Sequence, residues 1–218
     1  MNKPVDDFLN LFDLEKNIYL LRRHLGSIDK LQDHMLKLAS QLGPVISTAI
    51  LESKNIRSSL PVHTEGVYLK QPLPYFLLGC IQTAREGGET TVYDGRIATQ
   101  IITDTHPELT QAVIEYRSLA HGLSTEHQLI EGHTTKSGES IRTLVFRENC
   151  PTNRVVHLPP NWTEKKLYKY LRSVLERSKV LSHKWRRGDI LIVDNNFSLH
   201  GRTAFRGLRK MIRIRVEK

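Results

Sequence analysis

The chain has 218 residues, of which 39% are hydrophobic and 25% charged, and its formal net charge is +9. This length suits one domain over residues 1–218, and no apolar run approaches the roughly 20 residues that a membrane span requires. Cys80 and Cys150 lack the CxxC spacing of a zinc ribbon, and the N-terminus lacks the apolar stretch of a signal peptide. We therefore expect reduced thiols, a cytoplasmic location and no membrane partner.

The basic charge raises the question of a nucleic-acid partner. Lys and Arg are spread along the chain, however, without a long basic run and without aromatic residues interleaved among them. We therefore expect no nucleic-acid partner. An anionic small substrate or an acidic partner protein would account for the same charge.

Residues 1–42 carry apolar side chains at helical spacing, which predicts an N-terminal helical part of two or three short helices. These side chains are Phe8, Leu11, Phe12, Leu20, Leu21, Leu25, Leu31, Leu36, Leu38 and Leu42. From residue 43 the character changes, because 45–51, 75–81 and 89–93 are short β-branched or apolar runs that predict strands. The last of these runs ends at Asp94-Gly95, a turn signal.

Two later segments carry helix-start signals. In Thr105-His106-Pro107-Glu108, Thr105 as N-cap and Glu108 three residues later have capping-box spacing, and Asn161-Trp162-Thr163-Glu164 repeats it ahead of an amphipathic segment. Further strands are predicted over 115–124, 140–147, 189–194 and 209–217. The whole pattern predicts a mainly β fold with flanking helices (α+β), whose core over 43–218 is an antiparallel barrel or a double-sheet jelly roll with inserted helices.

The stretch PVHTEGVY, residues 61–68, places His63 and Glu65 on the same side of a strand, where they are either metal ligands or a polar spot before a turn. In a chain with ten histidines and 23 acidic residues, about one His-x-Asp/Glu pair is expected by chance. The second such pair, His106-Pro107-Glu108, is explained by the predicted helix start.

The C-terminal segment alternates, with Ile212, Ile214 and Val216 on one side and polar or sulfur-containing residues on the other. The latter are Arg209, Met211, Arg213 and Arg215. Alternation alone favours an amphipathic edge strand with solvated arginines over a strand whose arginines point into the barrel as anion ligands.

Several motifs in the same order along the chain resemble those of the taurine dioxygenase family of Fe(II)- and 2-oxoglutarate-dependent oxygenases. The resemblance covers about residues 38–216. Its motifs are His63-Thr64-Glu65, Gly87-Gly88-Glu89-Thr90, Trp185 with Gly188-Asp189, Asp194-Asn195, His200-Gly201-Arg202 and the Arg209/Arg213 pair, and upstream Gln41-Leu42-Gly43-Pro44-Val45 is also similar. The resemblance implies a double-stranded β-helix core. It also implies a metal centre of two histidines and one carboxylate, an arrangement that suits non-haem Fe(II) oxygenases.

By this resemblance, His63, Glu65 and His200 hold Fe(II), with 2-oxoglutarate as cofactor and O2 as co-substrate. Arg209 and Thr90 are expected to bind the far carboxylate of 2-oxoglutarate. Arg213 would bind the C1 carboxylate of 2-oxoglutarate or a carboxylate of the substrate. No catalytic residue beyond the metal ligands is expected.

Three other parts of the chain have two interpretations each. Arg202 either contacts the substrate or is structural, and Asn195 and Asn196 either brace the loop that carries His200 or form an ordinary turn. Residues 125–140, with His127 and His133, are either a lid or an exposed connector.

The implied reaction is hydroxylation, or alternatively desaturation, of an unactivated C–H bond in an amino acid or related small metabolite, with release of succinate and CO2. Glu65 replaces the Asp of most family members, as in the clavaminate synthase and asparagine oxygenase branch, and a retained carboxylate disfavours halogenation. Two alternatives stay open. One is the same chemistry on a substrate attached to an acidic carrier protein, and the other is a non-oxidative, cupin-type metal-binding protein.

Overall fold

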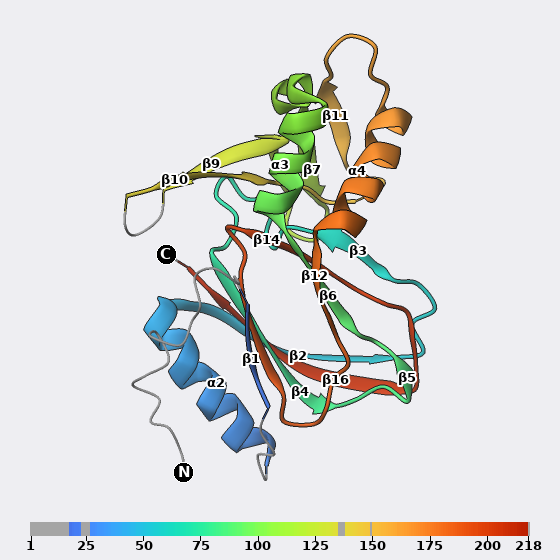
Figure 1. Ribbon diagram of the computed structural model, residues 1–218. Coiled ribbons are helices and arrows are strands. Elements are labelled where there is room, and N and C mark those ends of the chain that lie inside the picture. The colour runs from blue at the N-terminus through green and yellow to red at the C-terminus, as the bar shows by residue number, and fades with distance from the viewer. Residues whose placement is uncertain (1–17, 23–26, 135–137, 149, 218) are drawn as a thin grey trace.

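A computed structural model describes residues 18–22, 27–134, 138–148 and 150–217, and two antiparallel sheets form its centre (Figure 1). The first sheet has five strands, in the order β1 (Ile18–Leu21), β13 (Ile190–Asp194), β4 (Tyr75–Gln82), β16 (Leu208–Val216) and β2 (Val45–Lys54). The second has four, in the order β12 (Lys179–His183), β6 (Thr90–Asp94), β14 (Ser198–Arg202) and β3 (Leu60–His63). The predicted mainly β, double-sheet jelly roll is confirmed.

Side chains from both sheets pack against one another in the space between them. The cluster comprises Phe76, Leu78, Cys80, Leu191, Val193 and Met211 from the first sheet, Val92 from the second, and Trp185 from just beyond β12. Because successive residues of a strand point to opposite faces, the position of a residue along its strand decides whether its side chain enters this interior.

Strand β16 lies between β4 and β2, so the prediction of an edge strand with solvated arginines is wrong. Its Ile212, Ile214 and Val216 are buried beneath helix α2 (Ile28–Leu42), whereas Met211 points between the sheets. By alternation, the arginines of β16 share the face of Met211. The alternation of apolar and polar residues was predicted correctly. The apolar face, however, is the outer face of the sheet, because helix α2 covers it.

Among the described residues of the N-terminal part, α2 is one of the expected helices. Ser27 caps α2 by accepting a hydrogen bond from the backbone N–H of Lys30, and Leu31 and Met35 lie on its buried face. Residues 18–21, predicted as helical, instead form β1, which pairs with β13. A run of four apolar residues fits either structure, and pairing with a neighbouring strand decides it. Phe8, Leu11, Phe12 and Leu25 lie outside the described residues.

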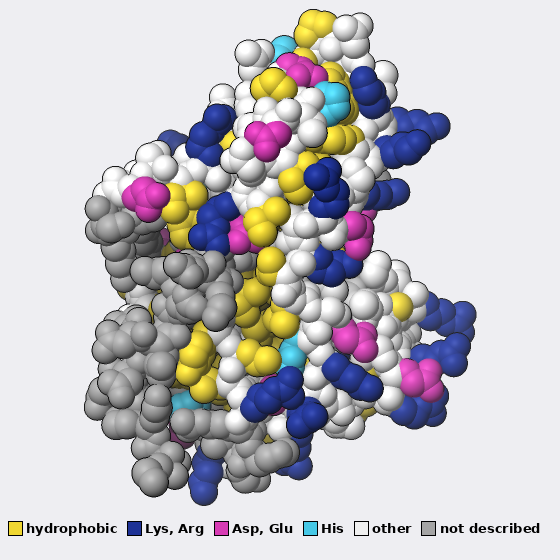
Figure 2. Space-filling view, viewed as in Figure 1, with side chains coloured by type: hydrophobic (Ala, Val, Ile, Leu, Met, Phe, Trp, Pro, Cys, Tyr) yellow, Lys and Arg dark blue, Asp and Glu magenta, His cyan; other side chains and the backbone are white. Residues whose placement is uncertain are grey.

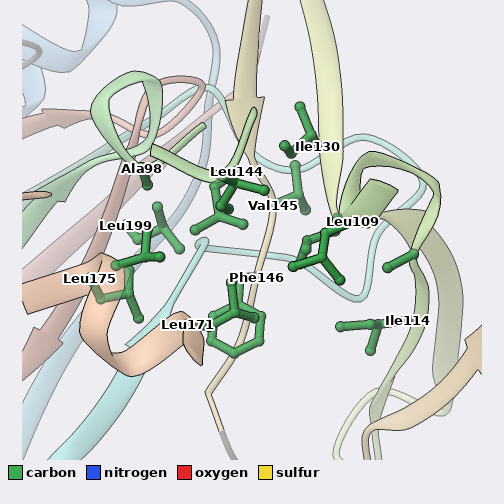
Figure 3. Packing of buried hydrophobic residues seen from close by; sticks show 14 of the residues in the cluster. Ala98, Leu109, Ile114, Ile130, Leu144, Val145, Phe146, Leu171, Leu175 and Leu199 are labelled. Carbon is green, nitrogen blue, oxygen red and sulfur yellow. The ribbon is translucent and has the colours of Figure 1, made fainter. Parts of the chain in front are cut away.

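A second layer covers the outer face of the four-stranded sheet (Figure 1). Its helices are α3 (Gly95–Thr105), the 3-10 helix η2 (Pro107–Gln111) and α4 (Glu164–Ser178). Its strands form a three-stranded sheet in the order β11 (Arg154–His157), β7 (Val113–Ser118) and β8 (Leu123–Gln128). A separate hairpin consists of β9 (Ile130–Thr134) and β10 (Ser140–Leu144). Figure 3 shows the core of this layer, where Leu171 and Leu175 of α4 pack near Leu199 of β14 and Phe146. The inserted elements are thereby attached to the sheet that carries His200.

The helix starts differ from the predicted ones. Asp94 does not end a turn but caps α3, its carboxylate accepting from the backbone N–H groups of Arg96 and Ile97. Thr105 is the last residue of α3, and η2 begins at Pro107 without a side-chain cap. Thr163, rather than Asn161, caps α4. At α3 and at α4, an Asp or Thr side chain next to the true first turn accepts hydrogen bonds from the free N–H groups.

The remaining strands agree with the sequence over 45–51, 75–81, 89–93, 189–194 and 209–217, within one or a few residues at their ends. The strand predicted over 115–124 is divided between β7 and β8 around the turn at residues 119–122. Strands β12 and β14 were not predicted, and neither was the short pair β5 (Glu86–Gly87) and β15 (Phe205–Arg206). No described helix is long and apolar enough to cross a bilayer.

His127 is a buried side chain of β8, so it does not lie in the exposed loop that the sequence suggested for residues 125–140. Its Nδ1 lies 2.7 Å from a carboxylate oxygen of Glu131, and its Nε2 lies 2.9 Å from the carbonyl oxygen of Leu69. Both neighbours can only accept, so both ring nitrogens donate and the imidazole is protonated. Burial alone would lower the pKa of His127, but the hydrogen bond and charge of Glu131 and the carbonyl of Leu69 raise it overall.

Replacing His127 by glutamine should destabilise the fold in a pH-dependent way. Because the folded-state pKa is raised, the stabilisation by His127 is fully present below its unfolded pKa of about 6.5 and is lost as pH rises through the folded-state value. The difference between wild type and His127→Gln should be about 2 kcal/mol at low pH and should shrink as pH rises. Urea unfolding from pH 5.5 to 9 measures it. His157→Gln, at an exposed position of β11, is the control, and a pH-independent difference would contradict the assignment.

Candidate metal and 2-oxoglutarate site

His63, Glu65 and His200 meet inside the jelly roll, although 135 positions separate Glu65 from His200. His63 ends β3 and His200 lies in the middle of β14, and the two strands pair with His63 directly opposite His200. One nitrogen of each histidine and one oxygen of Glu65 all lie within 4.8 Å of one another. The sequence suggested a loop for His200, whereas strand pairing holds it in register with His63.

The two carboxylate oxygens of Glu65 face different partners. Oε2 lies 3.5 Å from Nε2 of His63 and 3.6 Å from Nε2 of His200. Oε1 accepts a hydrogen bond from Nε of Arg215 at 2.5 Å and also contacts Nη2 of the same guanidinium. Burial pushes the pKa of Glu65 upward, but the hydrogen bond to His63 and the charges of the two histidines and Arg215 hold it well below its usual value. The carboxylate is therefore ionised.

Both histidines direct a ring nitrogen at the same point. Nδ1 of His63 donates to the carbonyl oxygen of Pro61 at 2.9 Å, which leaves Nε2, 3.5 Å from Oε2 of Glu65, as the nitrogen available to a metal. His200 is buried, and burial followed by the nearby charge of His63 lowers its pKa well below the usual value. Its ring also packs against Phe76, with centroids 4.2 Å apart. Two imidazole nitrogens and one carboxylate oxygen make a donor set that fits Fe(II).

Asn195 fixes the segment that carries Glu65, not the one that carries His200. Its Oδ1 accepts from the backbone N–H of Glu65 at 2.8 Å, and its Nδ2 donates to the carbonyl oxygens of Glu65 at 3.0 Å and Leu73 at 2.6 Å. Asn196 donates instead to Asp194, at the end of β13. Both sides of the Glu65 peptide are thus held by one buried amide side chain.

Thr90 and Arg209 lie in the same interior and offer donors suited to a carboxylate. Oγ1 of Thr90 accepts from the indole N–H of Trp185 at 3.0 Å, which leaves the hydroxyl hydrogen of Thr90 for another acceptor. Burial and the charge of Arg202 lower the pKa of Arg209 to about 10, and within the described part of the chain no carboxylate pairs with it. A half-buried guanidinium without a carboxylate partner among the described residues fits an anionic ligand.

Gly88 leaves room beside the Arg209 side chain. It has a φ of +80°, and a Cβ placed there would lie 3.3 Å from Cδ of Arg209 and 3.4 Å from Nε. A larger residue would be strained by its backbone and crowded by the arginine. This glycine belongs to the Gly87-Gly88-Glu89-Thr90 motif, so the motif places Thr90 and the space around Arg209 next to each other.

Arg213 and Arg202 differ in their surroundings. Nη1 of Arg213 lies 3.7 Å from Oε1 of Glu65, and its Nε is buried without a hydrogen-bond partner among the described residues. Arg202 packs over the ring of Phe205 at 4.8 Å and donates weakly to the carbonyl oxygen of Ser58 at 3.4 Å. Arg213 therefore lies beside the histidine–carboxylate cluster. Arg202 instead lies with Arg209 at the ring of Phe205, and its buried Nη1 likewise has no hydrogen-bond partner among the described residues.

Arg215 is the site residue that the sequence analysis did not identify. It appeared there only as one of the alternating side chains of the last strand, yet it makes the closest ionic contact to Glu65. The signal available in the sequence was its position, two residues after Arg213 and six after Arg209, which places it on the same face of the strand as those arginines. His133 lies in β9, within the segment suggested as a lid or connector, whose residues 135–137 are outside the described ones.

Comparison with known proteins finds similarities in both sequence and fold. The sequence model of the family described as "Taurine catabolism dioxygenase TauD, TfdA family" matches residues 20–215. A curated relative from Fischerella ambigua (strain UTEX 1903), named 3-((Z)-2-isocyanoethenyl)-1H-indole synthase, is 27% identical over 165 residues, which cover 67% of this chain. The aligned region spans only 58% of that relative's length.

Solved structures share the fold. PvcB, titled an Fe, alpha-ketoglutarate dependent oxygenase from an isonitrile synthetic pathway, superimposes with a TM-score of 0.78 at 21% identity, covering 99% of this chain and 81% of PvcB. PvcB from Pseudomonas aeruginosa gives the same TM-score at 22% identity, covering 99% of this chain and 80% of that one. A putative taurine dioxygenase from Burkholderia xenovorans gives 0.76 at 16% identity, covering 97% and 82%. These similarities confirm the double-stranded β-helix fold.

Proposed function

Because this chain belongs to the TauD, TfdA family of Fe(II)- and 2-oxoglutarate-dependent dioxygenases, we propose that it oxidises an unactivated C–H bond of a small, carboxylate-bearing, amino-acid-related molecule. Non-haem iron and 2-oxoglutarate are the cofactors of this family. The observation that carries the proposal is the convergence of His63, Glu65 and His200 on one point, beside Arg213, whose buried Nε has no hydrogen-bond partner among the described residues.

In this proposal, Fe(II) is held by Nε2 of His63, Nε2 of His200 and Oε2 of Glu65. When bound, the metal together with 2-oxoglutarate and O2 supplies the oxidant, with succinate and CO2 as by-products. The chain contributes two imidazole nitrogens, an ionised carboxylate and a buried setting that keeps bulk water away. Arg209 and the free hydroxyl hydrogen of Thr90 bind the far carboxylate of 2-oxoglutarate.

The charges around the metal support an anionic substrate. Arg215 is paired with Glu65, but Arg213 is farther from that carboxylate and keeps a buried Nε without a partner among the described residues. A buried donor without an acceptor is costly, so a ligand carboxylate is the natural partner of Arg213. We assign Arg213 to a carboxylate of the substrate, which orients the reacting C–H bond toward the metal.

The relatives bear on the outcome of the reaction. The product named for the Fischerella ambigua relative contains an ethenyl group, that is, a carbon–carbon double bond next to an isonitrile. Desaturation is therefore included with hydroxylation in the proposed activity. The substrate panel should contain aromatic amino acids and their N-substituted derivatives.

Anaerobic addition of Fe(II) and then 2-oxoglutarate to the metal-free protein tests the proposal. We expect a visible charge-transfer absorption band that requires both additions, and substrate-dependent succinate release when O2 is admitted with members of the panel. A cupin-type metal protein would bind iron but form no band with 2-oxoglutarate and no succinate with any substrate, and this result would overturn the proposal.

A carrier-bound substrate is a second form of the same chemistry, favoured by the basic surface of α4. Its exposed side chains include Lys165, Lys166, Lys169, Arg172 and Arg177, and Figure 2 shows Lys and Arg side chains gathered along this side of the molecule. An acidic carrier protein would complement this face. Turnover of carrier-bound substrate should then exceed that of free substrate and fall with ionic strength, whereas equal, salt-insensitive turnover would exclude a carrier.

A further inference from the structure

We infer that Arg215 is the positioning residue that makes Glu65 a ligand through one oxygen, and that this ion pair allows the chain to use glutamate where most of the family uses aspartate. The inference rests on the proposed metal site, because it concerns how one ligand of that site is held. It assigns a role to a residue that neither the motif nor the family resemblance singled out.

The contact is specific to one oxygen of the carboxylate. Nε and Nη2 of Arg215 both approach Oε1, while Oε2 faces the two histidines. Both side chains of the ion pair are shielded from solvent, with 17% of the Arg215 side chain and 5% of the Glu65 side chain exposed. A charge-assisted pair in such surroundings is much stronger than a surface ion pair, so it holds the orientation of the carboxylate.

Glutamate requires this additional restraint for a geometric reason. Its extra methylene adds one rotatable bond and lengthens the side chain by about 1.5 Å relative to aspartate. Asn195 already holds the backbone of Glu65 on both sides, which leaves the side-chain torsions as the remaining freedom. Arg215 removes this freedom by fixing Oε1, and Oε2 is then directed at Nε2 of His63 and Nε2 of His200.

Arg213 provides an internal comparison on the same face of the same strand. Its nearest approach to Oε1 is 3.7 Å, which is beyond hydrogen-bond distance. Both arginines place a positive charge near the metal position, and by Coulomb's law each charge alone opposes the binding of a divalent cation. Removing either charge should therefore strengthen metal binding unless the residue also positions a ligand. The two roles predict effects of opposite sign.

The test measures metal affinity of the metal-free, full-length protein without 2-oxoglutarate, by anaerobic titration with Co(II) and with Mn(II). The Co(II) absorption spectrum is recorded alongside, because it reports the coordination geometry independently of turnover. Arg215→Gln should weaken Co(II) binding by about 10–100-fold, the range found when residues that orient metal ligands are removed, and should change the spectrum. Arg213→Gln should leave the affinity unchanged or increase it.

Two further variants keep the test decisive. Arg215→Lys retains the charge but loses the two-nitrogen contact, so its metal affinity should lie between those of wild type and Arg215→Gln. It replaces Arg215→Gln in the test if that variant does not fold. Glu65→Asp should weaken binding, because the shorter carboxylate cannot reach both Arg215 and the histidines. In the Glu65→Asp background, Arg215→Gln should weaken metal binding little further, since the contact between Arg215 and the carboxylate is already lost.

The outcomes separate this inference from the proposed function. If wild type binds Co(II) and forms the 2-oxoglutarate band, but Arg215→Gln binds the metal as tightly as Arg213→Gln does, then Arg215 contributes only charge and the inference is overturned. If wild type takes up neither Co(II) nor Mn(II), the proposed metal site fails and the inference fails with it.

Discussion

Replacing His200 by alanine should abolish both Fe(II) binding and turnover. Among the described residues, His200 supplies one of the three donor atoms that converge in the interior, and its ring is buried at the centre of β14. Mutation of a residue that only orients a metal ligand typically weakens metal binding about 10–100-fold. Removal of a ligand itself should therefore weaken metal binding by more than about 100-fold. Anaerobic iron titration and succinate formation measure the two effects.

The same result is expected for His63→Ala and Glu65→Ala, because each removes one donor of the set. His106→Ala is the matched control, since His106 also belongs to a His-x-Glu sequence. Its Nδ1 lies 3.2 Å from Glu108, and its ring packs edge-on against Trp162 and Tyr170, with 39% of the side chain exposed. His106→Ala should lower stability slightly and leave iron binding intact. Normal turnover in His200→Ala would exclude His200 as a ligand.

Replacing Arg209 by alanine should raise the requirement for 2-oxoglutarate strongly without changing the iron content. Arg209 is a half-buried guanidinium without a carboxylate partner among the described residues, and Thr90 offers its hydroxyl from the same interior. Truncating one partner of a buried charge pair costs at least about 2 kcal/mol, which corresponds to about a 30-fold increase in the KM for 2-oxoglutarate. Steady-state kinetics at saturating Fe(II) and bound-metal analysis separate the two effects.

Lys210→Ala is the matched control for this variant, because Lys210 neighbours Arg209 on β16 but pairs with Glu52 of β2 at 3.0 Å. Its KM for 2-oxoglutarate should match that of wild type. A 2-oxo acid that lacks the far carboxylate gives a second check. Wild type should discriminate strongly against it, and Arg209→Ala should not. An unchanged KM in Arg209→Ala would mean that another group binds this carboxylate.

Much of the β core could be predicted from local patterns. The runs at 45–51, 75–81 and 189–194 are long enough and sufficiently β-branched or apolar to form strands whatever their partners are. Helix boundaries were less predictable, since Asp94 was assigned to a turn and Thr105 to an N-cap. Both residues have side chains that accept hydrogen bonds from turns and from helix starts, and the choice depends on the tertiary contacts of the following segment.

The N-terminal strand and β14 were missed for the same physical reason. Residues 18–21 and 198–202 are too short to show a period, and each is a strand because an existing sheet pairs with it. For β14 this matters for the site, since pairing with β3 in register brings His200 opposite His63. A loop position for His200 would have left its distance from His63 undetermined.

The sequence by itself determined the residue types of the site, the i, i+2 spacing that puts His63 and Glu65 on one side, and the shared parity of Arg209, Arg213 and Arg215. Alternation separates the two faces of a strand, but it does not tell which face is enclosed. Only the tertiary structure decided that β16 is an interior strand whose apolar face lies beneath α2 and whose arginines point between the sheets. It also decided that Arg215 meets Glu65 across 150 positions of chain, because such contacts follow from strand order and register rather than from any local pattern.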